Sequence, residues 1–116
     1  METDLKIALI QMTCEKGEIA RNVRRAIEFS AQAVEAGADI VCFPEGNLAG
    51  YIDPLRFPSA VIGWNDAQLA PLFQWFDDKP IIGVVGIVER NPSGKPFISQ
   101  GIIRSGELVG VYHKTH

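Results

Sequence analysis

The chain alternates between short apolar segments and an amphipathic one, in the order strand, helix, strand. Residues 5–12 are dense in Ile and Leu, which predicts a strand that is apolar on both faces. From Glu18 onward apolar residues recur at helical spacing, and Gly37 supplies the left-handed residue with which helices commonly end. Residues 38–43 are apolar except for Asp39 and predict a second strand. Because a crossover helix joins parallel strands, we expect helices to cover at least one face of the sheet.

The middle of the chain is less regular. Residues 45–65 are rich in Gly and Pro and predict a long loop, a feature that is usually functional or disordered in a compact domain. Residues 65–78 carry apolar side chains at helical spacing, and Asn65 stands where a helix N-cap is expected. Pro71 counts mildly against that helix.

The last third of the chain reads as strands without helices. Residues 80–89 predict a third strand, and the segment NPSGKP (91–96) has the composition of a turn, so the chain reverses there. Residues 97–105 and 107–114 predict two further strands around a tight turn. We therefore expect the last three strands to form an antiparallel meander.

Composition and charge narrow the classes of function. The chain has 116 residues, 47% of them hydrophobic, which suits one soluble globular domain. Its net charge of −3 offers no basic patch for nucleic acid, and no run of apolar residues is long enough to cross a membrane. The N-terminus does not resemble a secretory signal, and two cysteines are too few for a disulfide framework. A cytoplasmic location is the expectation.

A carboxylate stands at the end of the second predicted strand. In the segment DIVCFPEGNLAGY (39–51), Pro44 stops the strand and Glu45 follows it inside a turn that contains Gly46 and Gly50. Ligands of α/β sheets gather beyond the carboxyl ends of the strands, where the loops diverge. Glu45 is therefore a candidate general base, although taken alone it also fits an ordinary loop carboxylate in water.

A lysine ends the last predicted strand in the same way. Lys114 can hold a neighbouring carboxylate ionised or stabilise a developing oxyanion, and it equally fits an exposed lysine at a strand end. His113 and His116 form an H-x-x-H pair, but no Cys, Asp or further His lies near them in the sequence to complete a metal site. No metal is expected.

These motifs together resemble the nitrilase, or carbon–nitrogen hydrolase, superfamily. The resemblance rests on FPEGNLAGY after the buried strand and on VYHKTH at the end of a later strand, in this order and at this separation. It covers essentially the whole chain. It implies an α/β fold in which the chain, residues 1–116, is the N-terminal part of a single hydrolase domain, half of a four-layer α-β-β-α sandwich.

The resemblance also implies a mechanism. The family hydrolyses non-peptide carbon–nitrogen bonds with a Glu, a Lys and a nucleophilic Cys, through a thioester and without a cofactor. By motif matching, Glu45 takes the role of general base and Lys114 that of oxyanion stabiliser. The implied substrate is a small amide or nitrile, with an amide preferred, and the family usually forms oligomers. The substrate-binding residues and the branch of the family stay open.

The chain departs from the family pattern in one respect. The family's nucleophilic cysteine follows a strand well downstream of the lysine motif, and this sequence stops at His116. Cys42 is expected to be a buried core residue, and Cys14 precedes the first helix but matches no nucleophile motif. We therefore expect the chain alone to be inactive, to expose one apolar face of its sheet, and to pair with the missing C-terminal half or with another copy.

Two other readings remain open. A receiver-like signalling module has a similar length, an α/β sheet and a lysine after its last strand. Against it, the first strand ends in QMTC without an acidic pair for Mg²⁺, and residues 90–107 contain turns where a receiver needs a helix. A non-catalytic fragment that pairs with a partner chain is the second alternative.

Overall fold

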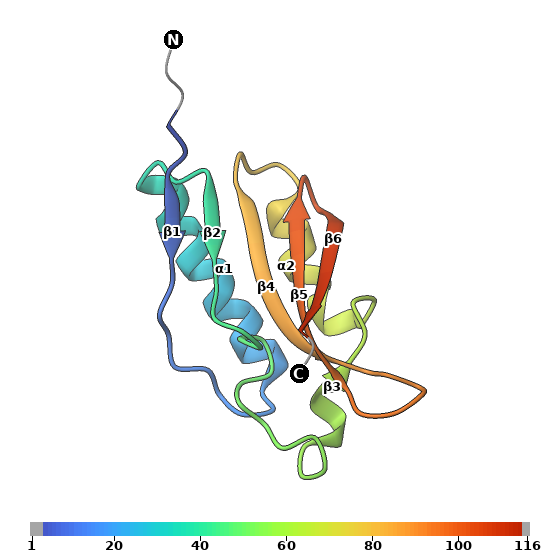
Figure 1. Cartoon of the computed structure of the whole chain (residues 1–116). Helices are drawn as coiled ribbons and strands as arrows, with labels where there is room; N and C mark the ends of the chain where they lie inside the picture. The colour runs from blue at the N-terminus through green and yellow to red at the C-terminus, as the bar shows by residue number, and fades with distance from the viewer. Residues whose placement is uncertain (1–3, 115–116) are drawn as a thin grey trace.

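The protein forms one mixed sheet with helices on a single side (Figure 1). The computed structural model describes residues 4–114, and within these the sheet has six strands in the order β1-β2-β4-β5-β6, with β3 paired to β4. The elements are β1 (Ile7–Leu9), α1 (Ile19–Glu35), β2 (Ile40–Cys42), η1 (Pro58–Ala60), β3 (Val61–Ile62), η2 (Ala67–Leu69), α2 (Ala70–Phe76), β4 (Ile82–Glu89), β5 (Phe97–Arg104) and β6 (Glu107–Lys114).

The first half has the predicted parallel pairing. β1 pairs with β2, and β2 pairs with β4, both in parallel. Helix α1 ends in a Schellman motif, in which the Ala38 amide donates to the Ala33 carbonyl at 2.9 Å and the Gly37 amide donates to the Val34 carbonyl at 3.0 Å. Gly37 has φ +81°, a conformation that side chains disfavour, so the predicted role of this glycine is confirmed.

The predicted meander is also confirmed. β4 pairs antiparallel with β5, and β5 with β6. Ser105 and Gly106 form the two-residue turn with φ of 52° and 77°, the positive values that a hairpin of this kind requires. The register shifts by one residue between Ile102 and Ile103, which pair with Gly110 and Leu108, so Val109 is left as the extra residue of a β-bulge.

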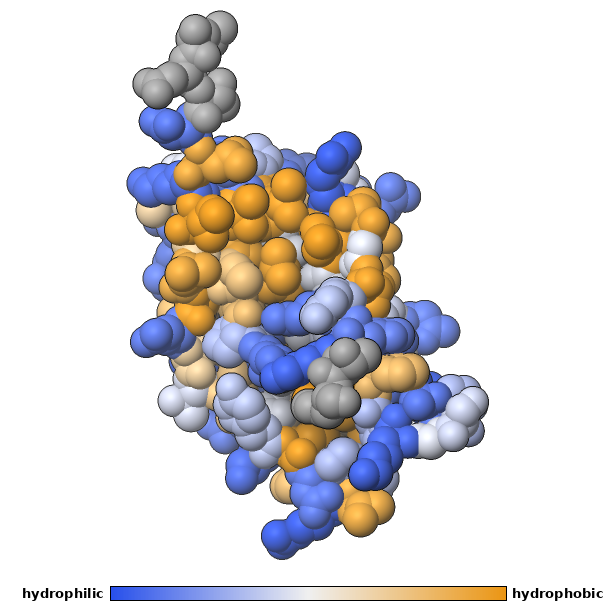
Figure 2. Space-filling view, in the orientation of Figure 1, coloured by the Kyte–Doolittle hydropathy of each residue, from blue (hydrophilic) through white to orange (hydrophobic). Residues whose placement is uncertain are grey.

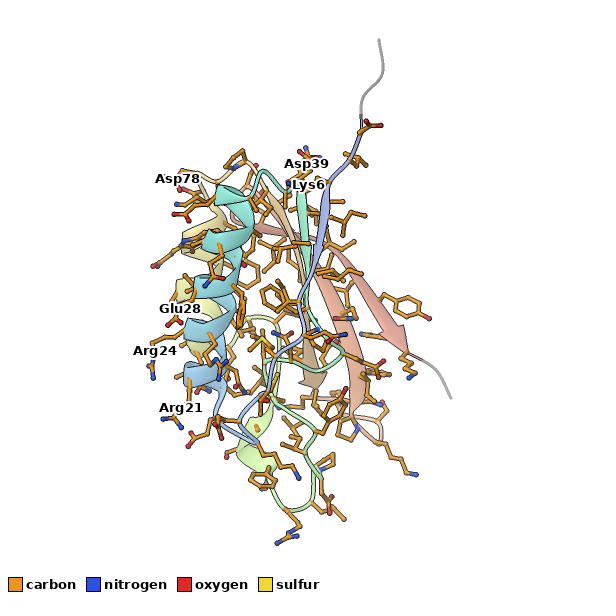
Figure 3. The ribbon with its side chains drawn as sticks, turned by 90° about the vertical axis from the view of Figure 1, so that its left-hand side faces the viewer. Lys6, Arg21, Arg24, Glu28, Asp39 and Asp78 are labelled. Carbon is orange, nitrogen blue, oxygen red and sulfur yellow. The ribbon has the colours of Figure 1, made fainter. Side chains whose placement is uncertain are left out.

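Both helices pack on one face of the sheet, as the side view shows (Figure 3). The buried core lies between them and the strands, and its largest members are Phe76, Leu48, Ile62, Leu69, Leu72, Ile87 and Ile103. The charged residues Arg21, Arg24 and Glu28 lie on the outer side of α1 (Figure 3). None of the helices in the described part of the chain combines the length and the apolar character of a membrane span.

On the opposite face of the sheet an apolar patch is uncovered in the upper part of the view, whereas the lower part is mostly polar (Figure 2). Ile7, Leu9 and Ile102 are 53%, 76% and 40% exposed on this face. Half-buried residues of β2 and β4 continue it between them: Ile40, Cys42, Ile82 and Val84. The expected exposure of one apolar sheet face is therefore present in the structure.

Three details differ from the sequence predictions. The first strand is only Ile7–Leu9, shorter than the predicted 5–12. The loop 45–65 contains a short strand, β3, which extends the pairing along β4 beyond the end of β2. The cap near the second helix is Asp66, whose carboxylate accepts from the Gln68 amide at 2.9 Å, so the assignment of Asn65 was wrong. Two adjacent polar residues of similar size made that position ambiguous.

Pro71 proves compatible with its helix because it lies in the first turn, where an amide has no partner to lose. The receiver-like alternative is contradicted by the meander. A receiver domain needs a doubly wound parallel sheet, whereas β4, β5 and β6 are antiparallel and are joined by turns.

Candidate active site

The carboxylate of Glu45 is carried by a tight turn that follows β2. The ladder continues one residue past the strand, where the Phe43 amide donates to the Val84 carbonyl at 3.0 Å, and Pro44 then ends it. The chain turns back on itself as the Gly50 amide donates to the Gly46 carbonyl at 2.9 Å. Both glycines have positive φ, 63° and 77°. Glycine is therefore favoured at both positions, directly after Glu45 and at the end of the turn.

This turn is docked against the middle of β4. The Leu48 amide donates to the Gly86 carbonyl at 3.0 Å, and the Gly86 amide donates to the side-chain carbonyl of Asn47 at 2.8 Å. A Cβ atom at position 86 would lie 2.4 Å from the Gly46 nitrogen. The absence of a side chain at Gly86 therefore allows the turn that carries Glu45 to lie directly on the sheet.

Asn22 is a buried polar residue that the sequence analysis did not single out. It lies on the inner face of α1, is fully buried, and donates to the carbonyls of Glu15 and Leu48 at 2.8 and 2.9 Å. Its own carbonyl accepts from the Glu15 amide at 2.9 Å. Asn22 thus ties the Glu45 turn to the segment before α1. A polar residue three positions after Ile19, on the apolar stripe of a helix, is the signal that could have found it.

Lys114 reaches Glu45 from β6, the last strand in the order of the sheet. Its Nζ donates to both carboxylate oxygens of Glu45 at 3.2 Å. The side chains are 47% and 37% exposed, so the pair contributes at most about 1 kcal/mol to stability. The two candidate residues are brought together, although β4 and β5 lie between β2 and β6 in the sheet.

A cavity of about 520 Å³ opens beside this pair. Glu45 lines it together with the loop after β2 and the ends of β4 and β5, and most of its wall is apolar: Tyr51, Ile52, Leu55, Val88, Ile98. Lys95 and Asp53 supply charged groups at its border. A largely apolar cavity with a few polar groups at one end is typical of a site for a small organic molecule.

Cys14 and Glu45 line a second cavity of about 360 Å³. Burial raises the pKa of the Cys14 thiol above its ordinary value, and the nearby charge of Arg25 only partly opposes this. A raised pKa leaves less thiolate at neutral pH, which is the opposite of what a nucleophilic cysteine needs. Cys14 lines a cavity next to Glu45, but its surroundings raise the thiol pKa instead of lowering it as a nucleophile requires.

Cys42 lies on the uncovered face of the sheet. It pairs with Leu9 in the ladder between β1 and β2 and is only half-buried. The prediction that Cys42 is a buried core residue was therefore wrong, because the described residues place no layer over this part of the sheet face. Both cysteines are thiols.

His113 is engaged by a carboxylate. Its Nε2 lies 2.8 Å from Glu89 Oε1, and its ring stacks on Phe97 with centroids 4.1 Å apart. His116 lies outside the described residues. Within residues 4–114 no group of three His, Cys, Asp or Glu side chains could hold a metal ion.

Comparison with known proteins bears on this site. Residues 6–116 match the carbon–nitrogen hydrolase family. The glutamine-dependent NAD(+) synthetase of Acinetobacter baylyi is 31% identical over 94% of the chain, and an arylacetonitrilase of Arthroderma benhamiae is 26% identical over 90%. The chain spans 20% and 35% of the lengths of these relatives.

Solved structures agree with the sequence match. The glutamine-dependent NAD+ synthetase of Acinetobacter baumannii, determined with ADP, superposes with a TM-score of 0.77 at 28% identity, over 97% of this chain and 21% of its own. An amidase from Nesterenkonia sp. superposes with a TM-score of 0.81 at 24% identity, over 97% of this chain and 43% of its own. The chain has the N-terminal part of that fold, as the sequence predicts.

Proposed function

Because the chain belongs to the carbon–nitrogen hydrolase family, we propose that it supplies the general base and the cation of an amide-hydrolysing active site. The observation that carries this proposal is the contact of Lys114 Nζ with both oxygens of Glu45 at the border of a cavity. A carboxylate and an ammonium held together, with space for a small molecule beside them, are two of the three groups that such a hydrolysis needs.

In the proposed reaction a cysteine from polypeptide beyond these 116 residues is the nucleophile. Glu45 takes the thiol proton, and the sulfur attacks the amide carbon to form a tetrahedral intermediate. The ammonium of Lys114 stabilises the oxyanion. The protonated Glu45 then returns its proton to the leaving ammonia, and a thioester remains. Water, activated by Glu45, hydrolyses the thioester and regenerates the thiol.

The proposed substrate is an amide. Three similar curated proteins are glutamine-dependent synthetases, so the side-chain amide of glutamine is the first compound to test. The mainly apolar wall of the cavity also leaves space for larger amides or nitriles. Within this proposal the protein acts in the cytoplasm, where its thiols stay reduced, and functions together with the second half of the domain, as an oligomer.

The proposal is tested on a complete protein that includes this chain. Ammonia release is measured from glutamine, asparagine, simple aliphatic amides and arylacetonitriles, and the intact mass of the enzyme is followed for an acyl adduct. We expect ammonia from at least one amide and an adduct on a cysteine outside residues 1–116. Absence of ammonia release from every compound would contradict the proposal.

A further inference from the structure

The last two described residues of β6 each pair with a carboxylate, on opposite faces of the sheet. Lys114 contacts Glu45 on the uncovered face, whereas His113 contacts Glu89 on the face that carries the helices. Consecutive side chains along a strand point to opposite faces, so the two contacts hold the end of β6 from both faces of the sheet. Nothing in the hydrolytic mechanism requires the second contact.

The contact of His113 is well defined in geometry. In the ladder Glu89 pairs with Phe97, and Ser99 pairs with His113, so these side chains share one face. A carboxylate oxygen can only accept, so the imidazole Nε2–H donates to Glu89 across the 2.8 Å separation. The imidazole and Phe97 rings are 3° from parallel. Stacking and hydrogen bond together fix the ring in one orientation.

The position of β6 explains why contacts on both faces would help to hold its end. Among the described strands β6 is at the edge of the sheet, so it has a ladder on one side only. A lysine side chain is long and flexible, and the exposed ion pair with Glu45 is too weak to hold the strand end by itself. Oxyanion stabilisation, however, requires a preorganised cation. The ladder with β5 pairs Lys114 with Ile98, and a side-chain contact next to Lys114 restricts this strand end further.

We propose that Glu89 and His113 form a positioning pair that holds the end of β6, so that Lys114 is kept against Glu45. The pair acts through the strand and touches neither the substrate nor the reacting atoms. Its catalytic consequence rests on the proposed function. Its structural consequence, the distance between Lys114 and Glu45, is independent of any activity.

The structural test uses crystal structures of the complete protein carrying Glu89→Ala or His113→Phe. The second variant keeps an aromatic ring over Phe97 and removes the donor to Glu89. We expect the separation of Lys114 Nζ from the Glu45 carboxylate to exceed ~4 Å in both variants, beyond ion-pair distance. The control is Asp78→Ala, which breaks the exposed contact of 2.8 Å with Lys79. An unchanged separation in either variant that yields a structure would overturn the proposal.

The kinetic test separates positioning from general stability. We expect Glu89→Ala to lower kcat by roughly 10- to 100-fold with KM changed less than threefold, since displacement of a catalytic group by about an ångström has effects of this size. Glu89→Gln keeps an acceptor for the imidazole N–H and should restore kcat to within about threefold of wild type. Wild-type kcat in Glu89→Ala, or a loss of kcat that Glu89→Gln does not restore, would contradict the proposal. If no substrate is found, the crystal structures still decide.

Discussion

Lys114 Nζ lies 3.2 Å from both carboxylate oxygens of Glu45, although 69 positions separate the two residues and two strands lie between their elements. The contact exists because β2, β4 and β6 all run in the same direction, so that their carboxyl ends meet at one edge of the sheet. The candidate site therefore forms only when β5 and β6 have joined the sheet.

Replacing the carboxylate of Glu45 should remove base catalysis without unfolding the protein. Glu45→Gln is nearly isosteric, but an amide cannot accept the proton of the thiol, so we expect kcat to fall by ~10²–10⁴-fold in the complete enzyme. The control is Glu28→Gln on the outer side of α1. Steady-state kinetics and thermal melting check this. Wild-type turnover in Glu45→Gln at an unchanged melting temperature would remove Glu45 from the mechanism.

Removal of the cation should be similarly damaging to the complete enzyme. Lys114→Ala eliminates the ammonium that we propose stabilises the oxyanion, and we expect a loss of ~10²–10³-fold in kcat. Lys79→Ala removes another paired lysine, whose ammonium lies 5.0 Å from the ring centre of Trp75, and serves as the control. If the two variants have equal kcat, Lys114 is an ordinary strand-end lysine.

The 116-residue chain by itself should release no ammonia from any amide or nitrile. The candidate site contains a carboxylate and an ammonium, and burial raises the pKa of the Cys14 thiol, so the thiolate is scarce at neutral pH. Accordingly, iodoacetamide should alkylate Cys14 slowly at pH 7 and faster as the pH rises. Turnover by the chain alone that disappears in Cys14→Ala would identify Cys14 as the nucleophile.

A methyl group at position 86 should dislodge the turn that carries Glu45. Because the new Cβ would lie 2.4 Å from the backbone nitrogen of Gly46, Gly86→Ala should lower the free energy of unfolding by about 1–3 kcal/mol. Gly94→Ala is the matched control, since its nearest neighbour, Asn91 Nδ2, would be 4.0 Å away. Chemical denaturation compares the two variants. Equal stabilities would mean that the turn is not held against β4.

The uncovered apolar face should make the isolated chain self-associate. Leu9 is 76% exposed on that face, so Leu9→Lys should reduce association, and binding of a hydrophobic dye, at little cost in stability. Leu55→Lys is the control, because Leu55 is 91% exposed but belongs to the loop after β2. Analytical ultracentrifugation measures the difference. A monomeric wild-type chain would show that the exposed face is tolerated in water.

The sequence predicted most of the framework because local signals agreed with the fold. Helical spacing, Gly37 and the Ser105–Gly106 turn each specify their structure through nearby residues. The motifs also gave Glu45 and Lys114 as candidates, and the structure places the two side chains in contact. Local signals could not reveal the order of strands in the sheet, which depends on pairing between distant segments. Nor could they reveal the partners of Asn22 and Glu89, Leu48 and His113, which lie elsewhere in the chain.

The burial of individual residues was predicted less well. Cys42 was expected to be buried, but it is only half-buried and lies beside the exposed Leu9 on the uncovered face. Apolar side chains on this face are suited to burial against a second layer, and residues 4–114 do not supply that layer. An apolar pattern thus specifies what a surface will bury, and the partner must be known separately.

The bulge at Val109 determines which face of the sheet each later residue of β6 occupies. Counted from the Ser105–Gly106 turn without it, Lys114 would pair with Phe97 and His113 with Ile98, so the ammonium would point away from Glu45. The extra residue reverses this parity for every position from Gly110 onward. Insertions or deletions in β6 between the turn and Lys114 should therefore come in even numbers of residues, unless they add or remove a bulge. Only such changes keep Lys114 on the same face of the sheet as Glu45.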